Sequence, residues 1–377
     1  GGNAFEGCSG LTELTLPNSV TSIADDAFHG CRGLTELTLP NSVTSIGDGA
    51  FRGCTGLTEL TLPNSVTSIG ESAFLGCRGL TELTLPNSVT SIGESAFSGC
   101  SGLEKIAVES GNSCYDSRDN CNSIIDTETN TLIVGCKNSV IPNSVRSIGD
   151  YAFYGCSGMT ELILPNSVRS IGDYAFYGCS GMTELILPNS VRSIGDFAFY
   201  GCTGLTELIL PNSVSSIGDI AFTYCSGLEK ITVESGNSCY DSRDNCNSII
   251  DTEFNTLIVG CKNSVIPNSV TSIGYYAFYG CSGLTELTLP DSVASIGDGA
   301  FICCSDLSKI TSLAEIPPVC GSGVFDRVNK TNCELIVPVI SVTAYKQAEV
   351  WNEFSNISGF SGVEVTVAGK TRKIVVE

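Results

Sequence analysis

The chain has 377 residues, and 42% of them are hydrophobic, so it carries enough apolar material for a sizeable core. Nineteen basic residues against 40 acidic ones give a formal net charge of −21, which argues against nucleic acid or an anionic membrane surface as a partner. No apolar run approaches the roughly 18 residues that a membrane-spanning helix needs, so we expect no direct membrane insertion.

A repeated unit dominates the organisation of the chain. The copy that begins at Leu11 ends at Gly33, and near-copies begin at Leu34, Leu57, Leu80, Met159, Met182, Leu205 and Leu284. Each unit of a repeat protein contacts only its neighbours, so a fixed short period predicts one solenoid in place of several globular domains.

Each unit contains three short apolar clusters separated by turn-forming residues. The first cluster, Leu11–Leu16, favours a strand, and Pro17 ends it because proline cannot donate to a sheet ladder. The second cluster, Val20–Ile23, is rich in β-branched residues, and glycine interrupts the rest, so no long helix fits between the strands. We therefore predict a β-rich leucine-rich-repeat solenoid of parallel strands, with a convex side of short strands and tight turns.

Two nearly identical insertions interrupt the period. The cysteine spacing lengthens between Cys100 and Cys156 and again between Cys225 and Cys281, and residues 109–145 differ from residues 234–270 at a single position. In the first copy, two β-prone segments flank residues 127–130, which predicts a β-hairpin. A register that pairs Ile125 with Leu132 also sets cysteines opposite each other in both copies: Cys121 with Cys136, and Cys246 with Cys261. A disulfide and two reduced thiols both satisfy that spacing.

Cysteines that keep the phase of the repeat, such as Cys31 and Cys54, are interpreted as small buried hydrophobes. After Thr311 the repeat decays into a predicted strand at 334–338 and a predicted helix at 341–351 that Ser341 caps, with Trp351 and Phe354 covering the last coil. The predicted organisation is a solenoid over 1–312 with insertions near 109–137 and 234–262, a capping segment over 313–360, and a terminal hairpin over 361–377.

Catalysis requires a positioned set of unlike groups, whereas a solenoid repeats the same groups. The one histidine, His29, occupies a variable turn position, and we interpret it as solvated. Cys114, Cys121 and Cys136 lack the paired spacing of zinc sites. Two ladders of carboxylates leave calcium binding as an alternative to a solvated acidic face, but the calcium-binding nonapeptide of β-solenoids is missing. We expect no enzymatic activity, no cofactor and no metal.

Two variable positions change character between the early and the late units. The position after the corner acid is small or polar in the early units and mostly aromatic in the later ones, and the position three residues further on changes to tyrosine. Stacked aromatic residues would form a strip able to hold sugar rings or an extended peptide. Neutral differences shared by duplicated units explain the same pattern without a ligand. The candidate ligand-binding residues are Tyr151, Tyr154, Tyr174, Tyr177, Phe197, Tyr200, Arg169 and Arg192.

The units Gly-Cys-x-Gly-Leu-Thr-x-Leu-x-Leu-Pro-x-Ser-Val-x-x-Ile-Gly-x-x-Ala-Phe resemble the BspA-like leucine-rich repeats of bacterial and some protozoan surface proteins. The resemblance implies export and a role in recognition or adhesion, with an extracellular-matrix protein or a cell-surface protein as the partner. The aromatic strip adds a glycan as an alternative partner. The resemblance carries over no ligand-contacting residue. The chain begins with the second half of a unit, so we expect any export signal to lie upstream. The alternative functions are a structural spacer that projects another domain from the cell surface, and a carbohydrate-binding module.

Overall fold

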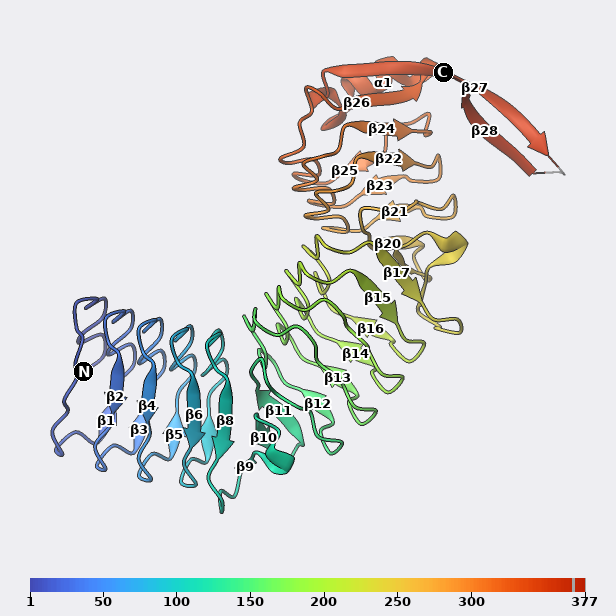
Figure 1. The fold of residues 1–377 in the computed structure, drawn as a ribbon. Helices are drawn as coiled ribbons and strands as arrows, with labels where there is room; N and C mark the ends of the chain where they lie inside the picture. Colours follow the sequence, from blue (N-terminus) through green and yellow to red (C-terminus); the bar gives the residue numbers. More distant parts are fainter. Residues whose placement is uncertain (368–369, 377) are drawn as a thin grey trace. The chain divides into compact units, whose positions relative to one another are not determined.

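The computed structural model describes residues 1–367 and 370–376, in which the chain winds into successive coils stacked one on the next (Figure 1). It divides into two compact units, Gly1–Leu205 with Ser216–Phe222, and Thr206–Ser215 with Thr223–Glu377. The fold is the predicted β-rich leucine-rich-repeat solenoid: neighbouring coils pair in parallel, for example Ser22 with Ser45 and Ile23 with Ile46.

One line of strands is built from the Ser-Ile dipeptide of each repeat, whose isoleucine points into the core and whose serine points outward. In the first unit these strands form two sheets. The four-stranded sheet contains β1 (Ser22–Ile23), β3 (Ser45–Ile46), β5 (Ser68–Ile69) and β7 (Ser91–Ile92). The seven-stranded sheet contains β9 (Tyr115–Asp116), β10 (Ile124–Asp126), β11 (Thr131–Val134), β12 (Ser147–Ile148), β13 (Ser170–Ile171), β14 (Ser193–Ile194) and β16 (Ser216–Ile217). In the second unit the matching six-stranded sheet contains β18 (Tyr240–Asp241), β19 (Ile249–Asp251), β20 (Thr256–Val259), β21 (Ser272–Ile273), β23 (Ser295–Ile296) and β25 (Val319–Cys320).

A second line of strands comes from the leucine-rich start of each repeat, in which alternate residues are buried and exposed. In the first unit its members are β2 (Glu36–Thr38), β4 (Glu59–Thr61), β6 (Glu82–Leu85) and β8 (Lys105–Val108). In the second unit they are β15 (Glu207–Leu210), β17 (Lys230–Val233), β22 (Glu286–Leu289), β24 (Lys309–Ser312), β26 (Glu334–Pro338) and β27 (Asn356–Val367), and β28 (Lys370–Val376) pairs antiparallel with β27.

Both insertions form the predicted β-hairpins, and each hairpin joins the solenoid sheet. In the first, β10 pairs antiparallel with β11 in the predicted register of Ile125 with Leu132, and β11 then pairs in parallel with β12. A bulge between Ile124 and Ile125 shifts the register, and Cys121 and Cys136 make separate contacts as free thiols. The second hairpin repeats this arrangement with β19 and β20, and Cys246 and Cys261 are also free thiols. Short 3-10 turns precede each hairpin at Arg118–Asn120 and Arg243–Asn245.

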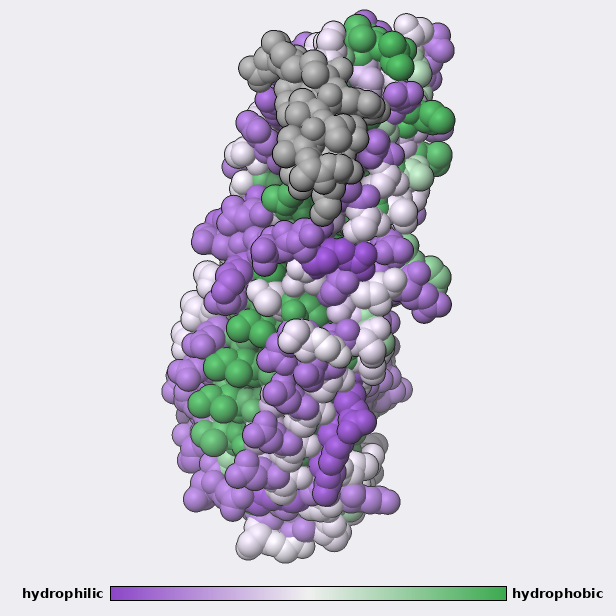
Figure 2. Space-filling model, turned by 90° about the vertical axis from the view of Figure 1, so that its right-hand side faces the viewer, coloured by the Kyte–Doolittle hydropathy of each residue, from purple (hydrophilic) through white to green (hydrophobic). Residues whose placement is uncertain are grey.

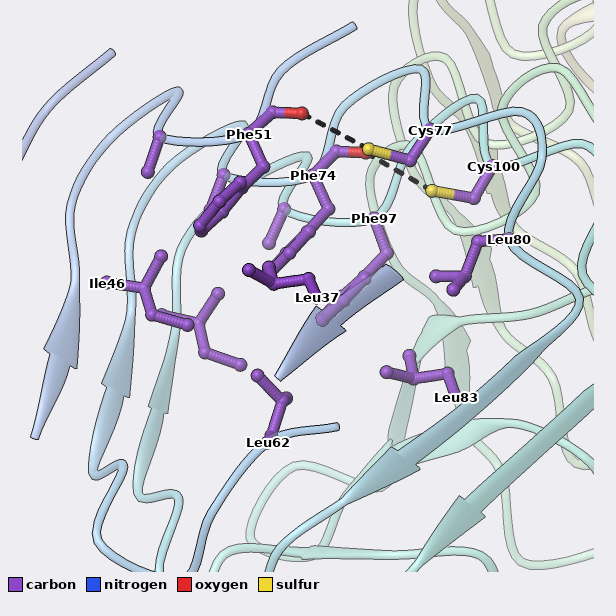
Figure 3. Packing of buried hydrophobic residues seen from close by; sticks show 14 of the residues in the cluster. Leu37, Ile46, Phe51, Leu62, Phe74, Cys77, Leu80, Leu83, Phe97 and Cys100 are labelled. Carbon is purple, nitrogen blue, oxygen red and sulfur yellow. Dashed lines mark hydrogen bonds between the residues drawn. The ribbon is translucent and has the colours of Figure 1, made fainter. Parts of the chain in front are cut away.

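The core between the sheets is a set of ladders in which the same residue recurs in successive coils between the insertions (Figure 3). The rings of Phe51, Phe74 and Phe97 stack with centroids 5.3 Å apart. Beside them, the thiol of Cys77 donates to the carbonyl oxygen of Phe51 at 3.2 Å, and Cys100 does the same to Phe74. Repeat-phase cysteines such as Cys77 and Cys100 therefore are buried packing residues, as their spacing predicts, and they also bond each coil to the coil before it.

A cap of α- and β-structure closes the second unit. Its helix α1 spans only Val342–Gln347, between 3-10 turns at Val339–Ser341 and Trp351–Glu353, so the helix prediction to residue 351 is wrong. The backbone becomes extended at Ala348, which ends the helix early, and the side chain of Ser341 makes no capping hydrogen bond. Trp351 and Phe354 are buried over the ring of Phe325, and the Trp351 indole donates to the carbonyl of Pro318 at 2.8 Å. Every helix in the described residues is too short to cross a bilayer.

Candidate ligand-binding surface

The corner of each coil is held by its acidic residue. The carboxylate of Asp150 accepts a hydrogen bond from the backbone N–H of Asp173 at 2.8 Å, and Asp173 accepts one from Asp196 in the same way. The glycine before each acid leaves room for that carboxylate, since a Cβ on Gly172 would lie 2.2 Å from Asp150 Oδ1. The corner acids, which the sequence presents as a solvated face, therefore link successive coils.

The residue after the corner acid adopts a left-handed backbone conformation. Its φ is +57° at Tyr151, +55° at Tyr174 and +54° at Phe197. Glycine takes this conformation without strain and occupies the position at Gly49 and Gly299, whereas other residues lose about 1–2 kcal/mol there. The chain therefore places bulky aromatic side chains at sites where the backbone favours glycine.

All six aromatic candidates come together in two columns in the first unit. Tyr151, Tyr174 and Phe197 form one column, and their ring centroids are 4.8 Å apart at each step. The other column contains Tyr154, Tyr177 and Tyr200, with centroids 4.8 and 4.9 Å apart. Tilted contacts within each coil join the columns, for example between Tyr151 and Tyr154 at 5.8 Å. The six side chains are half-buried and form one continuous surface.

The geometry of the columns changes what the surface offers to a ligand. Parallel stacking within each column uses the faces of the inner rings, so a partner meets ring edges and phenolic hydroxyls. Burial, then the neighbouring Tyr174 and Glu94, raises the pKa of Tyr151, so its hydroxyl remains a hydrogen-bond donor at neutral pH. A partially enclosed cavity of about 400 Å³ lies beside the first coil of the columns, and its lining includes Glu94, Tyr151 and Tyr154.

The two candidate arginines lie apart from the rings along the coil. Arg169 and Arg192 are exposed and come directly before the Ser-Ile strands β13 and β14, and the strand and corner acid separate them from the aromatic residues. Arg169 donates its backbone N–H to the carbonyl of Arg146, which places the arginines in a column of their own.

On the leucine-rich face of the same coils, Ile163 and Ile186 are 70% and 61% exposed. The two residues form an isolated parallel β-bridge. Figure 2 shows apolar side chains gathered in a row on the surface.

The histidine and the buried cysteines form structural contacts. His29 contacts the carboxylates of Glu6 at 3.4 Å and Asp26 at 3.7 Å. Burial raises the pKa of Cys156 to about 12 and raises the pKa of Cys179 well above its usual value, so both thiols stay protonated at neutral pH. No group of histidine, cysteine and acidic side chains within the described residues could hold a metal ion.

Comparison with known proteins gives consistent matches for this architecture. The family model of the BspA type leucine rich repeat region matches in six copies, over residues 1–125, 133–250 and 247–335. No curated protein sequence matches the chain.

Three solved structures share the fold. A leucine rich cell surface protein from Faecalibacterium prausnitzii is 32% identical, with a TM-score of 0.58, over 75% of this chain and 67% of its own. A leucine-rich repeat protein from Bacteroides ovatus is 28% identical, with a TM-score of 0.51, over 96% of this chain and 86% of its own. The pneumococcal vaccine antigen PcpA, at 23% identity and a TM-score of 0.52 over 91% of this chain and 72% of its own, shares the fold alone. With its repeats matched over most of its length, the chain belongs to the BspA-type leucine-rich repeat family.

Proposed function

We propose that the protein is an exported recognition or adhesion protein of the cell surface, which binds a macromolecule of a host or partner cell through the two aromatic columns. The cell-surface assignment of the similar Faecalibacterium protein supports the location. The columns themselves support the binding role, because they replace the small, polar or mixed residues that the early coils carry at the same positions.

The aromatic residues with a left-handed backbone conformation carry this proposal. Stacking contributes about 0.5–1.5 kcal/mol per aromatic pair, which is similar in size to the backbone cost of about 1–2 kcal/mol at each left-handed position. At Tyr151, Tyr174 and Phe197 the left-handed backbone therefore offsets most of what stacking contributes, and only the partial burial of ring area stabilises the fold beyond that. Fold stability alone gives a weak reason for the columns, whereas a binding surface gives a direct one.

Variants at the second column test the proposal. Tyr154, Tyr177 and Tyr200 are replaced together by serine, and binding is measured against an array of immobilised matrix proteins and glycans. The triple variant should keep its circular dichroism spectrum and lose the binding that the parent protein shows. A matched control is Phe254→Thr, which removes a 66% exposed ring from the second insertion and restores the residue of the first. Unchanged binding by the triple variant would contradict the proposal.

The alternative function, a spacer that projects another domain, predicts a different result on the same array. A spacer needs only the continuous ladders, and neither the parent protein nor any variant would then bind.

A further inference from the structure

A groove in the first unit contains three arginines. It has a volume of about 490 Å³, and Arg32, Arg52 and Arg78 lie along it. Arg52 comes directly before Gly53, whereas Arg32 and Arg78 come two residues after Gly30 and Gly76, so the three side chains leave the backbone at two different positions of the repeat. The three arginines belong to successive coils, whose phenylalanine rings are 5.3 Å apart, and Arg32 and Arg78 are therefore about 10 Å apart along the groove.

The floor of the groove is bare backbone. Gly53, Gly76 and Gly99 line it, each with a positive φ that favours glycine. Their N–H groups already donate to carbonyls of the next coil: Gly53 to Leu75, Gly76 to Ser98, and Gly99 to Tyr154. The floor therefore offers no free donor to the main chain of a peptide, and recognition depends on the side chains along the rim.

The groove is positive on an acidic protein. Among the described side chains, none forms an ion pair with Arg32, Arg52 or Arg78, although the chain carries 40 acidic residues and a formal charge of −21. All three side chains are exposed. Guanidinium groups bind carboxylates and sulfates through two parallel hydrogen bonds, so three free ones in a groove suit an anionic ligand.

An aromatic ring face closes one end of the groove. Tyr154 stacks on Tyr177 of the following coil, and its other face is directed to the preceding coil, where Cβ of a substituted Gly99 would lie 3.8 Å from the ring. The small residues Ser98 and Gly99 leave this face open to the groove, and Tyr154 is part of its lining. The first ring of the column thus presents the free face that the inner rings lack.

We propose that this groove binds an acidic oligosaccharide, whose carboxylate or sulfate groups pair with the three arginines while one sugar ring lies on the open face of Tyr154. The proposal rests on the proposed function and specifies its ligand class. A glycan fits better than an acidic peptide because the floor leaves no backbone donor for a peptide strand, and because about 10 Å between Arg32 and Arg78 suits acidic groups on alternate sugars.

Calorimetric titration with four hexamers tests the proposal: a hyaluronan hexasaccharide with carboxylates, a heparin hexasaccharide with sulfates, neutral chitohexaose and hexaglutamate. One or both acidic sugars should bind, and the affinity should fall as salt rises. The preferred acidic sugar identifies which anionic group the arginines select. Binding of chitohexaose or hexaglutamate as tightly as the better acidic sugar would overturn the proposal.

A charge-matched pair of variants locates the site. R32Q/R52Q/R78Q should weaken binding of the acidic sugar at least about tenfold, because each lost guanidinium removes charge-assisted hydrogen bonds. K105Q/K230Q/K346Q removes the same charge from three exposed lysines outside the groove and should leave the affinity within about twofold, as expected for exposed charges that make no contact with the ligand. The opposite pattern, or equal loss in both, would overturn the proposal. If all four hexamers fail while the array binding persists, the acidic-sugar inference falls and the recognition function stands.

Discussion

Tyr174 and Tyr177 allow a sharp test of the left-handed corner. Both belong to one coil and stack on equivalent tyrosines in the coil before, at 4.8 Å in each case. They differ in backbone conformation, since φ is +55° at Tyr174 and negative at Tyr177. Each residue is replaced separately by glycine and by alanine, and both replacements remove the ring. The difference in stability between the glycine and the alanine variant at one site therefore reports the effect of backbone conformation alone.

The two sites should give opposite signs. A left-handed conformation costs alanine about 1–2 kcal/mol, and glycine avoids this cost. Glycine loses about 0.5–1 kcal/mol relative to alanine through its greater freedom in the unfolded chain. At Tyr174 the first effect exceeds the second, and the glycine variant should be more stable by about 0.5–1 kcal/mol. At Tyr177 only the second effect acts, and the alanine variant should be more stable by about the same amount.

Urea unfolding followed by circular dichroism measures the four variants against one another. A repeat protein can unfold in steps, so the midpoints are compared only within each glycine and alanine pair. An alanine variant at Tyr174 that is as stable as its glycine counterpart would refute the reasoning. It would also remove the strain argument for a selected aromatic surface.

Two further predictions concern the core. Gly135 occupies a position where an added Cβ would lie 2.1 Å from the ring of Phe153, so Gly135→Ala should lower stability by about 1–3 kcal/mol. Gly158→Ala, where the nearest atom is the flexible Lys137 side chain at 3.2 Å, is the control, and an equal midpoint in thermal unfolding would contradict the prediction. Secondly, iodoacetamide at pH 8 should label the exposed Cys8 and spare Cys179, because burial raises the pKa of Cys179 and leaves almost no thiolate at that pH. Mass spectrometry reads the labelling, and similar rates at both sites in the folded protein would show that the ladder opens readily.

The sequence predicts the solenoid well because its period is strict. Strand, turn and core positions repeat identically, and even the register of Ile125 with Leu132 follows from the hairpin layout. The aromatic columns follow for the same reason, since residues one period apart must stack.

Sequence comparison missed two features. One is a group of arginines at different positions of the repeat, and the other is the left-handed backbone conformation at the corner. Arg32 and Arg78 share one repeat position, while Arg52 belongs to another, so a position-by-position comparison of units does not align the three. Their proximity appears only when adjacent coils are stacked. The left-handed corner had a signal in Gly49 and Gly299, but the aromatic residues at the same position obscured it.

The exact register of the ladders determines how this protein can change length. Within a run of uninterrupted units, the ladder contacts join residues at fixed offsets, such as the thiol of Cys54 with the carbonyl of Phe28 or Asp196 with Asp173. Within such a run, gain or loss of one whole unit leaves each remaining residue with a chemically equivalent partner. A change by part of a unit puts the ladders out of phase unless the extra residues form an element of their own, as the two inserted hairpins do. Recombination between near-identical units can therefore lengthen or shorten the groove and the aromatic columns in steps of one coil without unfolding the protein.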